Sequence, residues 1–136
     1  VLIVNPNNPT GSFVSTPELG ALAALCASRE VAIISDDVFA DYALSAEAAA
    51  RAARLGDRPD VLGFTLGGLS KSIGLPQAKL AWMLLTGPDA LVAAARQRLE
   101  LIADTYLSVS TPVQVAAGRL LTEGAPVRQQ IQQRLD

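Results

Sequence analysis

The sequence predicts an α/β fold built on parallel strands. Two short apolar runs, at 1–4 and 31–35, have the length and composition of buried strands. A periodic apolar segment that carries a helix-start signal lies between them. Both runs end in polar or turn-forming residues, so together they make one β-α-β unit, whose parallel strands place ligands at their carboxyl ends.

The first strand is expected at 1–4 and leads into a loop rich in Pro, Asn and Gly at 5–11. Ser15 and Glu18 have the spacing of a capping box, which predicts a helix from there to about Ser28. The second strand, at 31–35, runs directly into the acidic pair Asp36 and Asp37. The first two strands should therefore be joined by this helix.

The second half of the chain continues the alternation. The Ala/Arg-rich stretch at 43–60 is interpreted as a surface helix with solvated arginines and no chemistry. A strand is expected at 62–66, interrupted by Gly63, with a Gly67–Gly68 loop after it, and a further strand at 80–85. The Gly-Pro-Asp sequence at 87–89 opens a helix to about residue 102, and the Thr-Pro pair at 111–112 opens another.

Composition excludes several classes of partner and site. Of the 136 residues, 50% are hydrophobic and 18% charged, which is an ordinary globular balance rather than that of a disordered chain. The net charge of −2 and the lack of a basic block argue against nucleic acid and membrane partners, and no apolar run is long enough to span a bilayer. With Cys26 as the only cysteine, an internal disulfide and a multi-cysteine metal site are excluded. The absence of histidine excludes a Ser-His-Asp triad and most zinc sites. Any chemistry should use Lys, Asp or a cofactor.

Two charged residues at strand ends could carry that chemistry. A lysine such as Lys71 must lose its proton before its amine condenses with an aldehyde, and the surrounding Gly, Leu, Ile and Ser residues would favour that loss by desolvation. Asp36 could pair with a protonated pyridine nitrogen. Taken singly, Lys71 is also explained as a loop charge, Asp36 as a cap or salt-bridge partner, and Asn8 as a turn residue. The joint occurrence of these three residues in this order favours a catalytic role over the structural explanations.

The chain carries three motifs in this order: Asn-Pro-x-Asn-Pro-Thr-Gly at 5–11, Ser-Asp-Asp-Val-Phe-x-Asp-Tyr at 35–42, and Leu-Ser-Lys-x-x-Gly-Leu-Pro-x-x-Lys-x-x-Trp at 69–82. Together they resemble the central motifs of the class I/II aminotransferases. The segment at 102–112 also resembles one bacterial subgroup of these enzymes. The resemblance covers nearly the whole chain.

The resemblance implies a cofactor, pyridoxal 5′-phosphate, and a role for five residues. Lys71 matches the lysine that forms a Schiff base with the cofactor and then shuttles a proton. Asp36 matches the partner of the pyridine nitrogen, and Asn8 matches the asparagine that binds the 3′-oxygen. Lys79 stands where most of the family has an arginine on the phosphate, and Ser70 is a weaker candidate for the same group.

Three positions depart from the family pattern. Lys79 has an ammonium group in place of the planar guanidinium group of an arginine. The ammonium group still neutralises the charge of a phosphate, but its hydrogen bonds are less directional. Phe39 stands where a tyrosine hydroxyl commonly reaches the 3′-oxygen. Gly68 stands where many relatives have a phosphate-binding serine, and backbone amides of the Gly67–Gly68 loop could substitute for it.

The resemblance further implies an incomplete fold-type I large domain, with a mostly parallel sheet flanked by helices. Residues 1–136 would form its central part, without the N-terminal part and the C-terminal small domain, and would be inactive alone. The implied enzyme is a cytoplasmic homodimer that moves an amino group between an amino acid and a 2-oxo acid. Two alternatives stay open: β-elimination or decarboxylation on the same cofactor, and an aminotransferase-like sensor domain of a transcription regulator.

Overall fold

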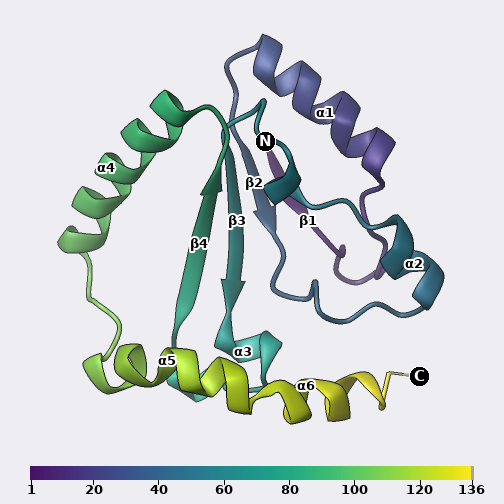
Figure 1. The fold of residues 1–136 in the computed structure, drawn as a ribbon, viewed down its shortest axis with the longest axis vertical. Helices are drawn as coiled ribbons and strands as arrows, with labels where there is room; N and C mark the ends of the chain where they lie inside the picture. Colours follow the sequence, from purple (N-terminus) through teal and green to yellow (C-terminus); the bar gives the residue numbers. More distant parts are fainter. Residues whose placement is uncertain (136) are drawn as a thin grey trace.

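A four-stranded open sheet forms the centre of the computed structural model, which describes residues 1–135 (Figure 1). The strands lie in the order β1-β2-β3-β4; the first two pairs are parallel and the last pair is antiparallel. In chain order the elements are β1 (Leu2–Val4), α1 (Thr16–Ser28), β2 (Ile33–Asp36), α2 (Ala46–Arg51), the 3-10 turn η1 (Leu55–Asp57), β3 (Gly63–Gly68), α3 (Leu69–Ser72), the 3-10 turn η2 (Pro76–Ala78), β4 (Ala81–Thr86), α4 (Asp89–Thr105), α5 (Thr111–Glu123) and α6 (Ala125–Gln132). The expected α/β architecture with a mostly parallel sheet is confirmed.

The strand register brings the ends of the first three strands to one edge of the sheet. Val4 pairs with Asp36, and Asp36 pairs with Leu66. Just beyond these pairs, the amide of Asn5 donates to the Asp36 carbonyl at 2.9 Å and the amide of Asp37 donates to the Leu66 carbonyl at 3.1 Å. All three sequence motifs therefore begin at the same edge, and α3 with the α5–α6 segment lies below it (Figure 1).

The core lies between α1 and one face of the sheet. Ser15 caps the helix, and its backbone amide donates to the Glu18 carboxylate at 2.9 Å, so the predicted helix start is confirmed. The buried side chains of α1 are Leu19, Ala23 and Cys26. They pack in one cluster with Ile33 of β2, Leu55 of η1 and Val61, which precedes β3. Full burial of a side chain such as Ile33 contributes roughly 1.5–3 kcal/mol.

Three details differ from the sequence-based expectations. The strand expected at 62–66 continues through Gly67 and Gly68, which pair with Trp82 and Ala81, so the expected glycine loop is wrong. Any side chain at Gly67 would overlap the Trp82 indole, and for this reason the strand carries glycine there. The stretch at 43–60 holds only the short α2 and η1, and α6 was not predicted.

Apolar side chains are exposed on the face of the sheet that points away from α1. Leu2 is 65% exposed, Ile34 36% and Met83 42%. In the described part of the chain, β1 and β4 are the edge strands, each with one partner. Exposed apolar faces and unpaired edges favour association.

We therefore expect residues 1–136 expressed alone to be insoluble, or compact without fixed packing. Size-exclusion chromatography and thermal unfolding of the isolated chain test this, with the full-length protein as the control. A monodisperse sample that melts in one cooperative transition would show that the exposed faces are tolerated.

Candidate active site

Lys71 and the loop after β2 face each other at the shared strand edge. Lys71 is the third residue of α3, which follows β3 directly, and its side chain is exposed. Its Nζ atom lies 5.5 Å from the centre of the Phe39 ring, within the range of a cation–π contact. A pocket of about 260 Å³ beside this contact is lined by Phe39, Ser70, Lys71 and residues of the C-terminal segment. The second and third motifs thus meet at Lys71.

Asp36 is the last residue of β2 and is half-buried. Strand alternation places it on the face opposite Ile33 and Ser35, which point to α1 and are buried. Its Oδ1 atom accepts a bond from the Val38 amide at 3.3 Å, which fixes the carboxylate against its own loop.

The remaining predicted site residues lie in irregular or short elements. Asn8 is exposed in the turn that follows β1. Lys79 is exposed at the end of η2, where its φ of 52° lies in the left-handed region. Ser70 is half-buried next to Lys71. Among the described residues, no hydrogen bond or ion pair joins Asn8 or Lys79 to Asp36 or Lys71, so the strand register alone brings these motifs to a common edge.

Asn5 has a structural part in the first motif. Its side-chain amide is buried, accepts a bond from the Val14 amide at 2.9 Å and donates to the Ala53 carbonyl at 3.0 Å. These bonds tie the end of β1 to the segments before α1 and after α2. The side-chain hydrogen bonds of Asn5 therefore hold the start of the turn that carries Asn8 in place.

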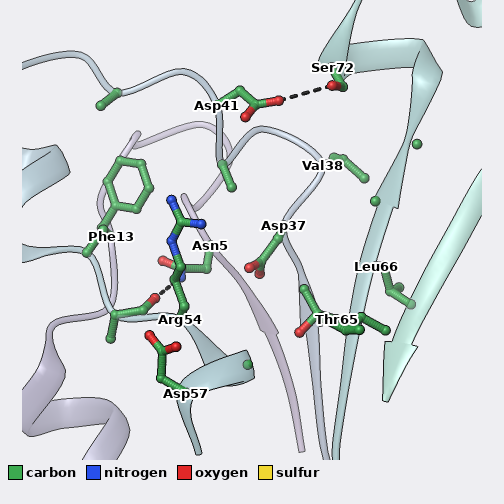
Figure 2. A pocket seen from close by; sticks show the side chains of 18 of the residues that line it. Asn5, Phe13, Asp37, Val38, Asp41, Arg54, Asp57, Thr65, Leu66 and Ser72 are labelled. Atoms are coloured by element: carbon green, nitrogen blue, oxygen red, sulfur yellow. Dashed lines mark hydrogen bonds between the residues drawn. The ribbon is translucent and has the colours of Figure 1, made fainter. Parts of the chain in front are cut away.

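A larger pocket of about 510 Å³ opens beside Asp37 and does not include Lys71 (Figure 2). Asp37, Arg54 and Asp57 line it together with the end of β3. Burial raises the pKa of Asp37, and the bond donated by the Ser35 hydroxyl and the positive charge of Arg54 partly oppose the rise, whereas Asp36 adds to it. The two acidic neighbours Asp36 and Asp37 thus lie in different surroundings.

Four polar residues around Lys71 were not assigned a role from the sequence. Asp41, Tyr42, Ser72 and Arg128 form connected hydrogen bonds to the end of α3. Asp41 and Tyr42 belong to the second motif, so their presence was visible but their contacts were not. Arg128 lies on the unpredicted α6, 56 residues after Ser72, and no local signal points to it.

The donor set at this edge matches the functional groups of pyridoxal phosphate. Lys71 could supply an amine for the aldehyde, and Asp36 could supply a carboxylate for the pyridine nitrogen. Asn8 could supply an amide for the 3′-oxygen, and Ser70 and Lys79 could supply a hydroxyl and an ammonium group for the phosphate. The residues present fit this cofactor. The described residues contain no cluster of acidic or sulfur side chains suited to a metal ion.

Comparison with known proteins identifies the family. The model of the family "Aminotransferase class I and II" matches residues 1–136. The glutamate-pyruvate aminotransferase AlaA of Escherichia coli K12 is 32% identical over 117 residues, which cover 85% of this chain and 28% of AlaA. The 1-aminocyclopropane-1-carboxylate synthase 6 of Oryza sativa subsp. japonica is 36% identical over 120 residues, 84% of this chain and 21% of the synthase.

Solved structures agree on the fold. An alanine aminotransferase from Pyrococcus furiosus superimposes with a TM-score of 0.80 at 22% identity, over 97% of this chain and 33% of that one. A PLP-bound structure from Clostridium difficile 630 gives a TM-score of 0.69 at 19% identity, over 98% and 34%. The chain spans about a third or less of the relatives that it matches. Because one family model covers all of its residues, the chain belongs to the class I and II aminotransferases, a pyridoxal-phosphate-dependent family.

Proposed function

We propose that the full-length protein is a pyridoxal-phosphate-dependent aminotransferase that moves an amino group between an amino acid and a 2-oxo acid. The observation that supports this most strongly is the position of Lys71, beside Phe39 in the loop that Asp36 begins. Bound pyridoxal phosphate supplies an aldehyde that condenses with amines and a ring that withdraws electrons. The other parts of the reaction fall to side chains of this chain.

We assign the proton transfer to Lys71 and the electrostatic support to Asp36. The Lys71 amine, once neutral, would take the proton from the substrate α-carbon and later give it back. The Asp36 carboxylate would keep a proton on the pyridine nitrogen through a charge-assisted hydrogen bond. Asn8 would orient the ring through the 3′-oxygen, and Ser70 and Lys79 would hold the phosphate.

We further propose that the protein acts as a cytoplasmic homodimer. The buried free thiol of Cys26 suits a reducing compartment. Exposed apolar side chains at the end of α4 and just after it support a partner subunit, because Leu101 is 71% exposed, Tyr106 73% and Leu107 fully exposed. No helix among the described residues has the length and apolar content needed to cross a membrane.

A half-reaction with the full-length protein tests the proposed activity. An amino acid added without an acceptor should be converted to one equivalent of 2-oxo acid per site, with a change in the cofactor's absorbance. A later addition of a different 2-oxo acid should restore the first spectrum. Release of ammonia or carbon dioxide instead would identify elimination or decarboxylation, and binding without turnover would favour a sensor domain.

Phe39 should tune the proton held at Lys71 Nζ. A tyrosine hydroxyl at this position would donate to the 3′-oxygen and draw negative charge from it, so the oxygen would hold the neighbouring proton on Nζ less tightly. In Phe39→Tyr we therefore expect the absorbance change of the bound cofactor to occur at lower pH. A displacement of one pH unit would correspond to about 1.36 kcal/mol.

Absorbance titration of the full-length protein measures this change. The unmodified protein is the matched control, because Phe39→Tyr keeps the aromatic ring beside Lys71 Nζ and adds only a hydroxyl. An upward displacement in Phe39→Tyr, or none when the new hydroxyl is seen on the 3′-oxygen, would contradict the proposed tuning.

A further inference from the structure

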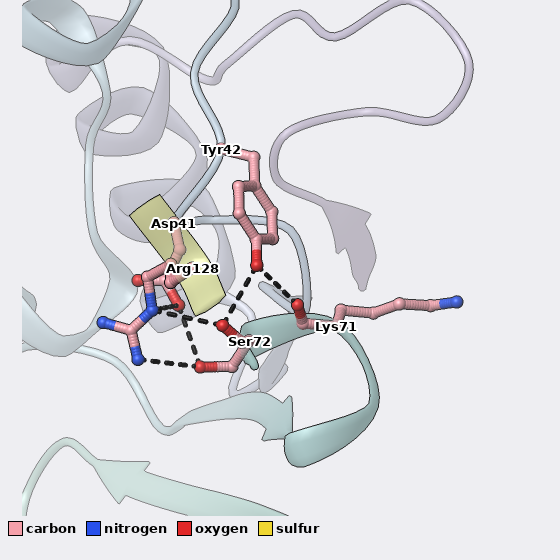
Figure 3. A network of polar contacts seen from close by, with 5 residues as sticks. All are labelled: Asp41, Tyr42, Lys71, Ser72 and Arg128. Atoms are coloured by element: carbon pink, nitrogen blue, oxygen red, sulfur yellow. Dashed lines mark hydrogen bonds and ion pairs between the residues drawn. The ribbon is translucent and has the colours of Figure 1, made fainter. Parts of the chain in front are cut away.

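A network of four side chains surrounds the backbone of Lys71 without touching its amine (Figure 3). We call Asp41, Tyr42, Ser72 and Arg128 the Arg128 network. The Tyr42 hydroxyl lies 2.7 Å from the Lys71 carbonyl oxygen and 3.0 Å from that of Ser72. Arg128 donates through Nε to the Ser72 carbonyl at 3.2 Å and through Nη2 to the Ser72 hydroxyl at 3.1 Å.

Asp41 closes the network. It accepts a bond from the Ser72 hydroxyl at 3.0 Å, and its Oδ2 atom lies 3.2 Å from Nε of Arg128. Asp41 and Tyr42 follow β2, Ser72 ends α3, and Arg128 belongs to α6. Three segments that are far apart in the sequence therefore meet at the residue after Lys71.

The network supplies hydrogen-bond donors for the carbonyl groups at the end of α3. The helix has four residues, from Leu69 to Ser72, and the last carbonyl groups of any helix have no partner inside it. Tyr42 and Arg128 provide donors for the carbonyl groups of Lys71 and Ser72. Without these donors, the turn that carries Lys71 would have few hydrogen bonds to other segments of the chain.

Burial decides which of these contacts matters most. Ser72 is 6% exposed and Tyr42 7% exposed. The side chains of Arg128 and Asp41 are 33% and 41% exposed, so their ion pair by itself contributes little to stability. Loss of Arg128 would, however, remove two of the donors to the nearly buried Ser72. Its carbonyl would then have only the Tyr42 hydroxyl as a donor, and its hydroxyl would keep only the bond that it donates to Asp41.

The Tyr42 hydroxyl is held in its donating form. Burial raises the pKa of Tyr42 and the negative charge of Asp41 adds to the rise, whereas Arg128 opposes it. A protonated hydroxyl has one O–H, which the Lys71 carbonyl at 2.7 Å and the Ser72 carbonyl at 3.0 Å share.

The Lys71 side chain extends away from all four residues in Figure 3. The hydrogen bonds of the network therefore reach Lys71 through the backbone of α3 and not through its side chain. We propose that Arg128 is a positioning residue: with Asp41, Tyr42 and Ser72, it fixes the turn that aims the Lys71 amine. This inference rests on the catalytic role proposed above for Lys71.

The test uses variants of the full-length protein. Arg128→Met keeps most of the aliphatic stem and removes every donor, and Arg128→Lys keeps the charge but not the two separate N–H directions. Tyr42→Phe removes the second donor, and it keeps the proposal testable if the arginine variants do not fold. Arg134→Met is the matched control, because Arg134 is an exposed arginine six residues further along the chain.

Three measurements separate positioning from general stability: kcat and KM for the half-reaction, visible circular dichroism of the bound cofactor, and amide hydrogen exchange without cofactor. In Arg128→Met we expect kcat to fall by about 10- to 100-fold with KM little changed, which is the scale for displacing a reacting group by about 1 Å. The dichroism should change, and the amides of residues 69–75 should exchange faster. Arg128→Lys should lie between Arg128→Met and the unmodified protein, and Arg134→Met should match the unmodified protein.

Two outcomes would overturn the inference while the proposed function stands. One is an Arg128→Met protein that equals Arg134→Met in all three measurements. The other is faster exchange at 69–75 with unchanged kcat and dichroism, which would make the network structural only. If the unmodified protein does not carry out the half-reaction, the proposed function fails first, and the role of Arg128 falls with it.

Discussion

Replacing Lys71 by alanine in the full-length protein is expected to lower the transamination rate by at least roughly 10²–10⁴-fold, the usual contribution of a positioned acid–base group. Lys71 belongs to α3, and its amine lies over the Phe39 ring. Asp36 ends the neighbouring strand β2 at the same edge of the sheet. Its removal takes away the group that carries the substrate proton. The rate of the half-reaction, followed by absorbance with saturating amino acid, measures the effect.

Lys71→Arg separates proton transfer from charge. A guanidinium group keeps the positive charge but does not lose its proton in a protein, so it cannot accept the substrate proton. Lys71→Arg should therefore be about as slow as Lys71→Ala. Near-normal turnover in either variant would mean that another residue moves the proton.

Asp36→Ala should give the second large effect. The carboxylate at the end of β2 would lose its charge-assisted bond to the pyridine nitrogen, and such a bond contributes roughly 1.5–3 kcal/mol. That range corresponds to a rate loss of about 10- to 150-fold. Some cofactor should stay bound, because the proposed phosphate contacts of Ser70 and Lys79 are unchanged.

Asp37→Asn is the matched control for Asp36→Ala. Asp37 is adjacent in the chain but lines the larger pocket and accepts its bond from Ser35. We expect Asp37→Asn to keep most of the turnover, as measured by kcat and by the cofactor content of the purified protein. Unchanged turnover in Asp36→Ala would mean that this carboxylate is structural.

The sequence predicted the architecture because its signals are local. The apolar runs at 1–4 and 31–35, with the Ser15–Glu18 helix start between them, are sufficient to specify a β-α-β unit. The same unit explains why the three motifs begin at one edge, since parallel strands end there together. The assignment to a family came from the motifs, and the family model confirmed it. The catalytic and binding roles of single residues stay predictions.

The missed features depend on contacts that are distant in the sequence. Gly67 and Gly68 have the composition of a loop, but pairing with β4 and the space taken by the Trp82 indole place them in a strand. Arg128 reaches Ser72 across 56 residues, and nothing beside it in the sequence indicates that contact. Such residues become visible only when the chain is folded.

The identity of the lysine that binds the cofactor is the central claim. Borohydride reduction of the purified full-length protein, followed by proteolysis and mass spectrometry of the peptides, tests it most directly. We predict a yellow protein in which reduction leaves the mass of the cofactor on the peptide that contains Lys71, at one label per chain. A label on Lys79 or on any other lysine, or no label on a protein that transaminates, would contradict the account.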